Sequence, residues 1–548
     1  MTSLSLQRLT AEVLKNVNNI SGFYAQHVLP YLAKQRKASY IASAAVLFIC
    51  YQVYQFAHIP KKLKHIPAVP FWAYMRSVLS GEGPDKRLNL IYSVLSDSPS
   101  GVFLKPHRVG WTVGAVGPQA LKTVWIRKDD YPKSQSLIED KRFLFAKMLG
   151  VHNILGLNGA EWKKHRMIAN PAFHRHMPVK LFGKLCERMM SRFEIEEIGL
   201  SSVDISALMQ RFTLDVIGLA GFGYDFQSIE NPDNQKVMAY NSVMDGLKDP
   251  FFFFFPFFEK HMLWAFSSRR EQHLNCESLH TTYQNIIENK KRVLLEQKGR
   301  QEDPEKDLLT LMLEAGEDDP SQALTDEELR ENLSVFFIAG HDTTSNALSF
   351  ALYWLAVNPD IQEKARSEVI KVIGDGADVF YPTENQISQL KYIYMIMKET
   401  DTSFLQTLRL CPPVLSSQLR HTEEDIELAG TVIPKGVHIQ AEIFVAHHDP
   451  SVWKDPEQFR PERFAAGGEN EENARKGLAW SPFGNGARQC IGMNFSLAEQ
   501  RVVLSMLLRK YTWTLPKDSI HKGHPVFVGG SSLLLSAQDL HLSFKNRF

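Results

Sequence analysis

Hydrophobic residues recur at helical spacing through most of the chain, and one segment shows this most clearly. Thr325-Asp-Glu-Glu328 fits a capping box, in which the Thr325 hydroxyl and the Glu328 carboxylate satisfy free amides at a helix start. Mainly apolar residues then continue to Val357, and Asn358-Pro359 predicts the helix end. About 33 residues at 1.5 Å per residue give roughly 50 Å, enough to cross a domain. Apolar residues on all sides of its flanks predict a buried helix.

The middle of this helix interrupts its own hydrophobic pattern with the sequence Ala339-Gly340-His341-Asp342-Thr343-Thr344. A glycine inside a helix costs about 1 kcal/mol relative to alanine, and a buried aspartate needs a polar partner. A local rule broken inside a buried helix indicates either a functional site or a kinked core helix with a satisfied polar patch. This motif alone leaves both interpretations open.

Strand-like sequence punctuated by turn residues is concentrated near residues 101–117, 411–440 and 525–548. Neither an internal repeat nor a low-complexity linker divides residues 71–548. We therefore predict one large domain over 71–548 that is mainly α with a minor β-sheet region.

The N-terminal pattern differs from that of the body. Apolar residues between Leu6 and Tyr24 recur at helical spacing, which predicts an amphipathic segment within 1–37 that lies on the body or on a membrane surface. Residues 38–57 carry no formal charge and are long enough to span ~30 Å of hydrocarbon. We expect an uncleaved transmembrane anchor over 38–58, with a cleaved signal peptide as the alternative, and a proline hinge over 59–70. Basic residues flank the anchor on both sides, so charge leaves its orientation open.

Composition places the chain among ordinary globular proteins. Of its 548 residues, 44% are hydrophobic and 22% are charged, which excludes a disordered, collagen-like or multi-span membrane protein. The net charge of +1 provides no bulk field that would favour nucleic acid as a partner. The five cysteines are too scattered for a disulfide framework or a zinc site, which suggests reduced thiols in a cytosol-facing body.

One cysteine stands in a distinctive loop. Residues 483–492 read Phe-Gly-Asn-Gly-Ala-Arg-Gln-Cys-Ile-Gly, ahead of a helical pattern from Asn494 to Arg509. Glycines permit a tight loop, and backbone amides near a helix start stabilise a thiolate at Cys490. Arg488 can bind an anionic group beside it. The loop therefore indicates either a thiolate that binds a soft metal or a small buried cysteine before a helix.

The spacing F-x-x-G-x-R-x-C-x-G over 483–492 resembles the haem-ligand loop of the cytochrome P-450 superfamily, the haem-thiolate monooxygenases. The stretch 339–344 is similar to that family's oxygen-activation motif, and W-K-K-H-R over 162–166 resembles its W-x-x-x-R helix. Segments 409–436 and 459–464, the latter reading F-R-P-E-R-F, follow the family's order. The resemblance extends from residue 60 to about residue 545 and implies the cytochrome P-450 fold with haem b bound through a cysteine thiolate.

The resemblance also implies roles for individual residues. Cys490 is the expected thiolate ligand of the haem iron, Thr343 the distal hydroxyl, Asp342 its acidic partner, and Gly340 the residue that opens a groove for oxygen. Arginine suits the haem propionates because its fork binds carboxylates at two points, whereas the alternative for Arg166 and Arg420 is a surface ion pair. The residues expected to bind or cover the haem are Trp162, Arg166, Arg420, Phe483, Arg488 and Gly492.

The chain departs from the family pattern K-E-T-L-R-L-x-P-P because the seven residues Asp401–Thr407 separate Glu399 from Arg409. In a continuous helix the rise between these two becomes ~15 Å instead of ~4.5 Å, which excludes a direct ion pair. Three interpretations stay open: a bulge that keeps the pair, a longer helix that uses Gln406, or an in-frame gene-model error, which the clean join of the flanks favours. In the first, Glu399, Arg409 and Arg463 form a structural network that braces the haem loop.

Two weaker features concern surfaces. The sequence F-F-F-F-F-P-F-F over 251–258 indicates core packing, a substrate entrance or a contact with the bilayer. Lys163, Lys164 and Arg166 form a basic strip that is either a solvated face or, by the resemblance, the surface that receives an acidic reductase.

The resemblance implies a haem-dependent monooxygenase that inserts one atom of O2 into a hydrophobic organic substrate with electrons from NADPH. The expected partners are an NADPH–cytochrome reductase flavoprotein, with cytochrome b5 as a further candidate, a hydrophobic small molecule and membrane lipid. We expect a single-pass protein of the endoplasmic reticulum membrane with a cytosolic catalytic domain. The alternatives are isomerase or peroxygenase chemistry at the same haem, against which Asp342-Thr343 argues, or an inactive haem binder because of the interrupted E-x-x-R.

Overall fold

Most segments with a helical hydrophobic pattern form helices in the computed structural model. The structure describes residues 53–174, 177–196, 202–297, 306–318, 323–397, 407–528 and 534–548, with isolated positions before residue 53. The chain forms two units, residues 1–61 and 62–548. The expected amphipathic segment and most of the expected anchor over 38–58 lie outside the described residues. Within the described part, no helix combines the length and the apolar character needed to cross a membrane.

The helices of the second unit fall into two runs along the chain. The first run comprises α3 (Phe71–Leu79), α4 (Leu88–Leu95), α5 (Pro118–Ile126), α6 (Leu144–Leu149), α7 (Gly159–His174), α8 (Val179–Glu196), α9 (Ile205–Val216), α10 (Gln235–Lys248), α11 (Pro250–Phe254), α12 (Pro256–Met262) and α13 (Ser267–Gln297). The second comprises α14 (Leu308–Asp318), α15 (Asp326–Val357), α16 (Pro359–Ile373), α17 (Glu384–Gln389), α18 (Lys391–Met397), α19 (Thr407–Leu410), α20 (Ile443–His447), α21 (Glu469–Ala474) and α22 (Met493–Lys510). Short helical turns include η5 (Ile217–Gly221), η7 (Pro461–Phe464) and η8 (Gly486–Arg488).

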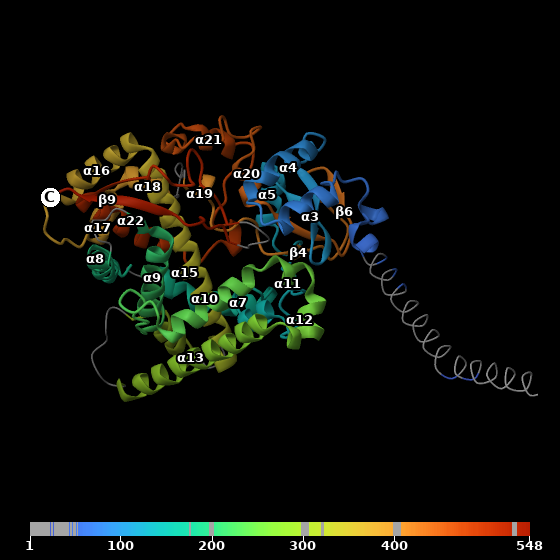
Figure 1. Ribbon diagram of the computed structural model, residues 1–548, viewed down its shortest axis with the longest axis horizontal. Helices are drawn as coiled ribbons and strands as arrows, with labels where there is room; N and C mark the ends of the chain where they lie inside the picture. The colour runs from blue at the N-terminus through green and yellow to red at the C-terminus, as the bar shows by residue number, and fades with distance from the viewer. Residues whose placement is uncertain are drawn as a thin grey trace, which may run out of the picture. The chain divides into compact units, whose positions relative to one another are not determined.

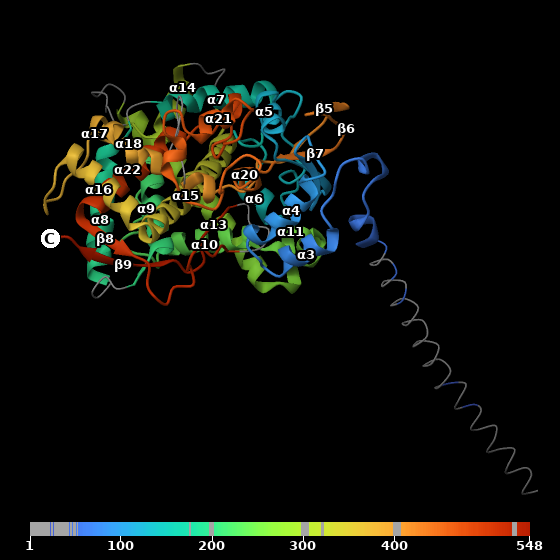
Figure 2. The ribbon, with the colours of Figure 1, turned by 90° about the horizontal axis from the view of Figure 1, so that it is seen from above.

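The strands form three small sheets. They are β1 (Val102–His107), β2 (Gly110–Ala115), β3 (Val203–Asp204), β4 (Arg420–His421), β5 (Ile426–Leu428), β6 (Thr431–Ile433), β7 (His438–Ala441), β8 (Tyr511–Thr514) and β9 (His541–Asn546). One sheet has the order β1-β2-β7-β4, in which only β2 and β7 are parallel, and a second has the order β3-β9-β8. Figures 1 and 2 show these two sheets at opposite sides of the second unit.

The structure confirms a mainly helical domain with a minor β region. Each of the three strand-like regions contributes strands, but β3 and β8 were not predicted. β3 has only two residues and β8 only four, too short for an alternating pattern to be recognised in the sequence. Both become strands because they pair with β9, a contact between distant parts of the chain.

Helix α15 has the boundaries and the burial that its pattern predicts. The Thr325 hydroxyl accepts a hydrogen bond from the Glu328 amide at 3.2 Å, and the Glu328 carboxylate accepts from the Thr325 amide at 2.7 Å. The helix ends at Val357, and its second half from Thr344 to Ala356 is buried throughout. It packs against α9, α13 and α22, and Figure 1 shows it running through the interior of the second unit. Its central turn is therefore enclosed by protein.

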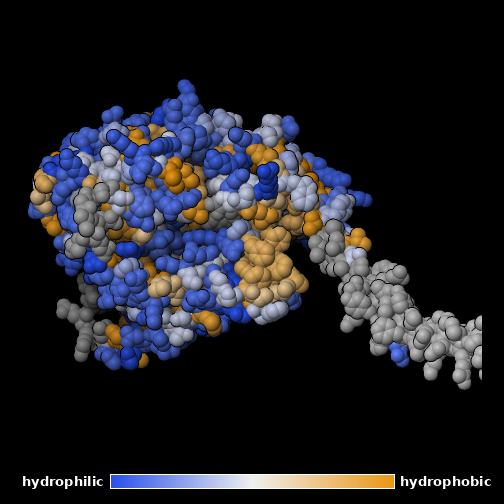
Figure 3. All heavy atoms as spheres, viewed as in Figure 1, coloured by the Kyte–Doolittle hydropathy of each residue, from blue (hydrophilic) through white to orange (hydrophobic). Residues whose placement is uncertain are grey.

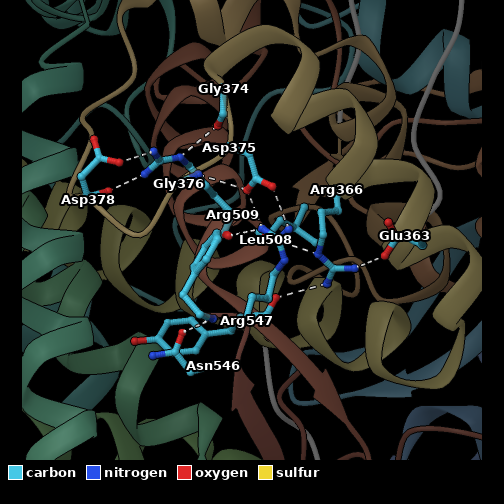
Figure 4. A network of polar contacts seen from close by, with 12 residues as sticks. Glu363, Arg366, Gly374, Asp375, Gly376, Asp378, Leu508, Arg509, Asn546 and Arg547 are labelled. Carbon is cyan, nitrogen blue, oxygen red and sulfur yellow. Dashed lines mark hydrogen bonds and ion pairs between the residues drawn. The ribbon is translucent and has the colours of Figure 1, made fainter.

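Arginines fasten the C-terminal segment to the helical body (Figure 4). Arg366 on α16 is buried and donates from Nε to the carbonyl of Leu508 on α22 at 3.1 Å. Arg547, just beyond β9, pairs with Asp375, just beyond α16, at 3.0 Å. These contacts fix α22, whose other end follows the distinctive cysteine loop.

Candidate active site

A cavity of about 300 Å³ lies between the central turn of α15 and the loop that precedes α22. Its walls also include α7 and the extended segment that leads into β4. The structure thus brings together segments separated by more than half of the chain. The lining contains these residues singled out in the sequence: Trp162, Arg166, Gly340, Thr343, Arg420, Phe483, Arg488, Cys490 and Gly492.

The cysteine loop is closed by its own backbone. The amide of Cys490 donates to the carbonyl of Phe483 at 2.9 Å. Gly484 has a φ of +67°, and a Cβ there would lie 3.0 Å from the ring of Trp125, so glycine answers both a backbone and a space requirement. Cys490 is exposed to the cavity that it lines and is otherwise surrounded by protein, whereas Cys186, Cys276 and Cys411 are buried.

Opposing effects act on the pKa of the Cys490 thiol. Burial raises the pKa of the thiol, whereas the amides of Gly492 and Met493 and the guanidinium of Arg166 oppose that rise in part. A metal ion at the sulfur would reverse the balance, because a coordinating thiol is deprotonated outright. The loop is therefore built to present a sulfur to a cation in the cavity.

Four cations gather in the same cavity, and we call Lys133, Arg166, Arg420 and Arg488 the cation cluster. Lys133 and Arg420 are buried, and none of the four forms an ion pair with another residue that the structure describes. The Nη1 atom of Arg488 and the Nε atom of Arg420 are buried without a hydrogen-bond partner in the described chain. Buried cations without anions are unfavourable, so these residues favour a negatively charged ligand in the cavity.

The pKa values record this crowding of positive charge. Burial lowers the pKa of Arg488 to about 9, with help from Arg420 and Arg166, and burial alone lowers that of Arg420 to about 10. Burial and the three arginines hold the pKa of Lys133 well below its usual value. Two carboxylates would relieve all four groups, and a haem carries two propionates at one edge. The donor set and the free sulfur together fit haem b.

Lys133 and Trp125 were not identified from the sequence. Lys133 donates to the carbonyl of Leu155 at 2.7 Å, and Trp125 lies with its ring 5.6 Å from the guanidinium carbon of Arg420. Both line the cavity. Neither residue stands in a recognisable motif. Their place in the cavity lining follows from the tertiary structure, in which Lys133 pairs with Arg420 of β4.

The α15 wall carries the expected hydroxyl. The Oγ1 atom of Thr343 donates to the carbonyl of Ala339 at 2.5 Å, and Thr343 lines the cavity. At Gly340 a Cβ would lie 2.9 Å from the Cδ1 atom of Ile217, so glycine allows α15 to approach η5 closely. This contact gives Gly340 a packing role in addition to its place in the lining.

Asp342 does not line the cavity but faces α10. Its Oδ2 atom accepts a hydrogen bond from the Tyr240 hydroxyl at 2.6 Å and lies 3.5 Å from Nδ1 of His341. Burial alone would raise the pKa of Asp342, but His341, Lys248 and the Tyr240 hydroxyl outweigh it and hold the pKa below its usual value. Tyr240, which lies 102 positions away, was not identified from the sequence.

Arg409 and Arg463 hold one segment, residues 454–458, from two sides. Arg409 donates to the carbonyls of Pro456 and Gln458 at 2.5 and 3.3 Å, and Arg463 donates to that of Asp455 at 2.6 Å and pairs with Glu469. Both arginines are buried. We call these two residues and their contacts the arginine brace; the predicted network of Glu399, Arg409 and Arg463 stays a prediction.

The same brace reaches the cysteine loop through His447. Arg409 donates to the His447 carbonyl at 2.7 Å, and the Nε2 atom of His447 accepts from the amide of Ser481 at 3.0 Å. Burial holds the pKa of His447 well below its usual value, so the ring is neutral and can accept. Ser481 lies two residues before the first residue of the loop, Phe483.

The third expected member of this network, Glu399, lies outside the described residues. Helix α18 ends at Met397 and α19 begins at Thr407, so the insert Asp401–Thr407 is described only at its last residue. Gln406 also lies outside. The three interpretations of the insert stay predictions.

Comparison with known proteins identifies a family. The family model described as Cytochrome P450 matches residues 81–534. The chain is 30% identical to the 11-oxo-beta-amyrin 30-oxidase of Medicago truncatula over 439 residues, which are 76% of this chain and 77% of that protein. It is 30% identical to Cytochrome P450 4F8 of Homo sapiens over 395 residues, 68% of this chain and 72% of that one. The crystal structure of the cytochrome P450DA heme domain shares the fold with a TM-score of 0.70 at 22% identity, covering 88% of this chain and 98% of that one.

Proposed function

The chain belongs to the cytochrome P450 family of haem-thiolate monooxygenases, and from this premise we propose that it oxidises a hydrophobic small molecule in the cavity beside Cys490. The proposal rests on one arrangement above all. The Cys490 sulfur, the cation cluster and the Thr343 hydroxyl line the same cavity. This arrangement supports a catalytic rather than a merely haem-binding role.

The residues of the chain divide the work at this site. When bound, the haem supplies the dioxygen chemistry, through an iron held by the cysteine thiolate. The cation cluster orients the group by its carboxylates, and Phe483 covers the sulfur side of the cavity. Thr343 keeps its own proton on the Ala339 carbonyl, which leaves the lone pairs of Oγ1 free to accept a proton donor from the cavity.

Asp342, the predicted acidic partner of Thr343, lies behind the cavity wall rather than in its lining. The carboxylate of Asp342 is ionised and held by Tyr240 on the side away from the cavity. We propose that it acts on Thr343 indirectly, by fixing the turn of α15 that carries both residues. Adjacent helix positions point about 100° apart, which agrees with this division.

The electron donor proposed is an NADPH-dependent flavoprotein reductase, with cytochrome b5 as a further candidate. Lys163 is exposed on α7, and Trp162 and Arg166 of the same helix line the cavity. A basic surface over a haem edge suits an acidic partner, because charge complementarity raises the association rate.

We also propose that the protein is a single-pass resident of the endoplasmic reticulum membrane with a cytosolic catalytic domain. Support in the second unit comes from an exposed surface that we call the aromatic patch, formed by Trp72, Phe255, Phe257 and Trp264. Phe257 is 60% exposed and Trp264 71%. Figure 3 shows a pale orange area over α11 and α12. Large exposed aromatic surfaces mark membrane or protein contacts.

The decisive experiment is the carbon monoxide difference spectrum of the reduced full-length protein. A Soret band at the position typical of thiolate-ligated haem is expected for the wild type and should disappear in Cys490→Ser. The matched control is Cys276→Ala, which changes a buried cysteine outside the cavity lining and should keep the band. A thiolate band that survives Cys490→Ser would refute the assignment.

A further inference from the structure

Most polar groups in the cavity already have a use. The cation cluster and the indole N–H of Trp125 offer donors to the haem carboxylates, and that N–H has no partner among the described residues. The amide of Gln489 reaches the sulfur of Met493 at 3.6 Å. These groups account for the donors that the cavity presents.

The hydroxyl-bearing side chains of the lining are also satisfied. Thr344 and Ser496 bond to each other at 2.8 Å across the contact of α15 with α22, and Nε2 of Gln500 donates to Ser496 Oγ at 2.9 Å. Ser417 Oγ accepts from the amide of Ala441 at 2.9 Å. Thr343 is engaged with Ala339, as described above.

One acceptor remains. The Oε1 atom of Gln418 is buried and has no hydrogen-bond partner in the part of the chain that the structure describes, and Gln418 lines the cavity. Among the described side chains of the lining it is the one buried acceptor that forms no hydrogen bond, whereas Thr343 Oγ1 is already bonded to Ala339. The other unpartnered side-chain atoms there belong to Trp125, Arg420 and Arg488 and are donors. A buried carbonyl without a donor is unfavourable, so a bound molecule should provide one.

The backbone fixes where Gln418 points. Leu419 is buried, and its carbonyl accepts from the amide of Ser134 at 2.8 Å. Gln418 and Arg420, two positions apart on either side of the buried Leu419, both line the cavity. Two residues of extended chain span about 6.6 Å, so Gln418 lies about that far along the backbone from Arg420 of the cation cluster.

The donor that Gln418 lacks does not come from the haem edge. Haem propionates are ionised and only accept hydrogen bonds, so they leave a carbonyl acceptor unsatisfied. Apart from the haem-binding cations, much of the lining is apolar, and it includes Ile217, Phe336, Ala339, Val414 and Ile443. The missing donor must therefore belong to the molecule that fills the apolar part of the cavity.

We propose that Gln418 is a specificity-determining residue that binds a hydroxyl group of the substrate. The substrate class is then a predominantly apolar molecule with a hydroxyl, and this assignment rests on the proposed function. A hydroxyl both donates and accepts, so it satisfies the amide of Gln418 in either orientation about its terminal bond. A molecule without the hydroxyl leaves the buried amide unpaired, and such sites reject analogues that lack the polar group.

The test uses probes that are anchored on the iron and therefore need no knowledge of the substrate. 4-Phenylimidazole and its ortho-, meta- and para-hydroxyphenyl isomers are titrated into the full-length holoprotein, and the Soret shift gives each Kd. In the wild type, at least one isomer should bind roughly tenfold more tightly than 4-phenylimidazole, because one hydrogen bond to a buried group supplies about that factor. Gln418→Met should abolish this preference without weakening 4-phenylimidazole itself.

Two further variants make the result specific. Gln500→Met makes the same chemical change at a cavity glutamine that is already bonded, and the hydroxyl preference should persist. Gln418→Glu keeps an acceptor at the position and should also retain the preference. It serves as the second variant if Gln418→Met folds poorly.

The outcomes separate the alternatives. If all three isomers show the same Kd ratio to 4-phenylimidazole in wild type and Gln418→Met, the proposal is wrong. If Gln418→Met instead loses haem while the ratios stay unchanged, Gln418 belongs to the haem-binding set and the proposal is equally overturned. A wild type that binds haem and the imidazoles but catalyses no oxidation would contradict the proposed function and leave this assignment standing.

Discussion

At the scale of single residues, the site is governed by charge that the protein does not neutralise by itself. Lys133, Arg420 and Arg488 lie in the cavity with atoms that are buried and, in the described chain, without anions. Folding brings these groups together at an energetic cost, and the carboxylates of a bound haem would offset that cost. The uncompensated positive charge of these groups therefore favours binding of a dianionic ligand.

This account predicts how Lys133→Met changes stability with pH. The pKa of Lys133 lies well below its usual value in the folded state, so between that value and the unfolded one the unfolded chain binds more protons. Stability of the haem-free wild type should therefore rise with pH through this window. Lys133→Met should be more stable than wild type at neutral pH and should show a flatter pH profile, measured as Tm from pH 6 to 10.

The haem-loaded protein provides the control for Lys133→Met. There the propionates stabilise the protonated amine, so the same substitution should speed haem loss, measured by transfer to a haem-scavenging globin. A haem-free Lys133→Met protein that is less stable than wild type at pH 7 would contradict the charge argument.

At the scale of elements, the turn of α15 that carries Asp342 and Thr343 is held by a contact with α10, on the side away from the cavity. Tyr240 on α10 donates to the buried carboxylate of Asp342, and its ring lies 4.9 Å from that of His341. A hydrogen bond to a charged group is among the stronger side-chain interactions. The Tyr240 hydroxyl therefore adds a polar contact to the ring packing between α10 and α15.

Removing that hydroxyl with Tyr240→Phe should destabilise the protein by about 1.5–3 kcal/mol, because the Asp342 carboxylate loses a charged hydrogen bond in the interior. Urea unfolding of the holoprotein followed by circular dichroism measures this loss. The matched control is Tyr283→Phe on α13, since the buried Tyr283 hydroxyl has no partner among the described residues and its removal should cost little. Equal losses in the two variants would argue against a role for the Tyr240–Asp342 contact.

The insert between α18 and α19 provides a second prediction at this scale. If Asp401–Thr407 is a gene-model error, its deletion rejoins Glu399 with Arg409 at the helical spacing of an ion pair. Haem content per protein, measured as the pyridine haemochrome, should then rise. Replacing the seven residues by a Gly/Ser stretch of equal length is the control and should give no gain, whereas unchanged or lower haem in the deletion would count against the error.

At the scale of the whole molecule, buried structure and exposed surface serve different tasks. The arginine brace around residues 454–458 and the contacts of Arg366 and Arg547 fix the frame that carries Cys490. The aromatic patch on α3, α12 and the following turn takes no part in that frame. Exposed aromatics of this size are unfavourable in water and favour a membrane interface.

The patch yields a prediction for membrane binding. Residues 62–548, which form a unit by themselves, should bind neutral phosphatidylcholine vesicles, and the double change Phe257→Ser with Trp264→Ser should weaken binding roughly tenfold or more. Vesicle flotation measures the bound fraction. Val379→Ser, at a residue that is 54% exposed outside the patch, should have no effect, and equal binding by all three proteins would contradict the proposal.

The sequence alone determined the elements with strong local signals. The capping box at Thr325, the extent of α15 and the cysteine loop each depend on residues within one turn or one loop, so spacing was enough to identify them. The comparisons confirm the family resemblance, the monooxygenase class and the thiolate-bound haem that these motifs indicated. The roles of individual site residues stay predictions, although nine of them line one cavity.

Only the tertiary structure revealed the groups that act across long separations in sequence. Lys133 joins the cation cluster, Tyr240 holds Asp342, His447 holds the cysteine loop, and Gln418 is left with an unpaired acceptor. None of them stands in a motif, because a hydrogen bond or a shared cavity depends on distance in space rather than on order along the chain. Local spacing encodes helices and tight loops, whereas the partners of a buried polar group are decided when those elements pack.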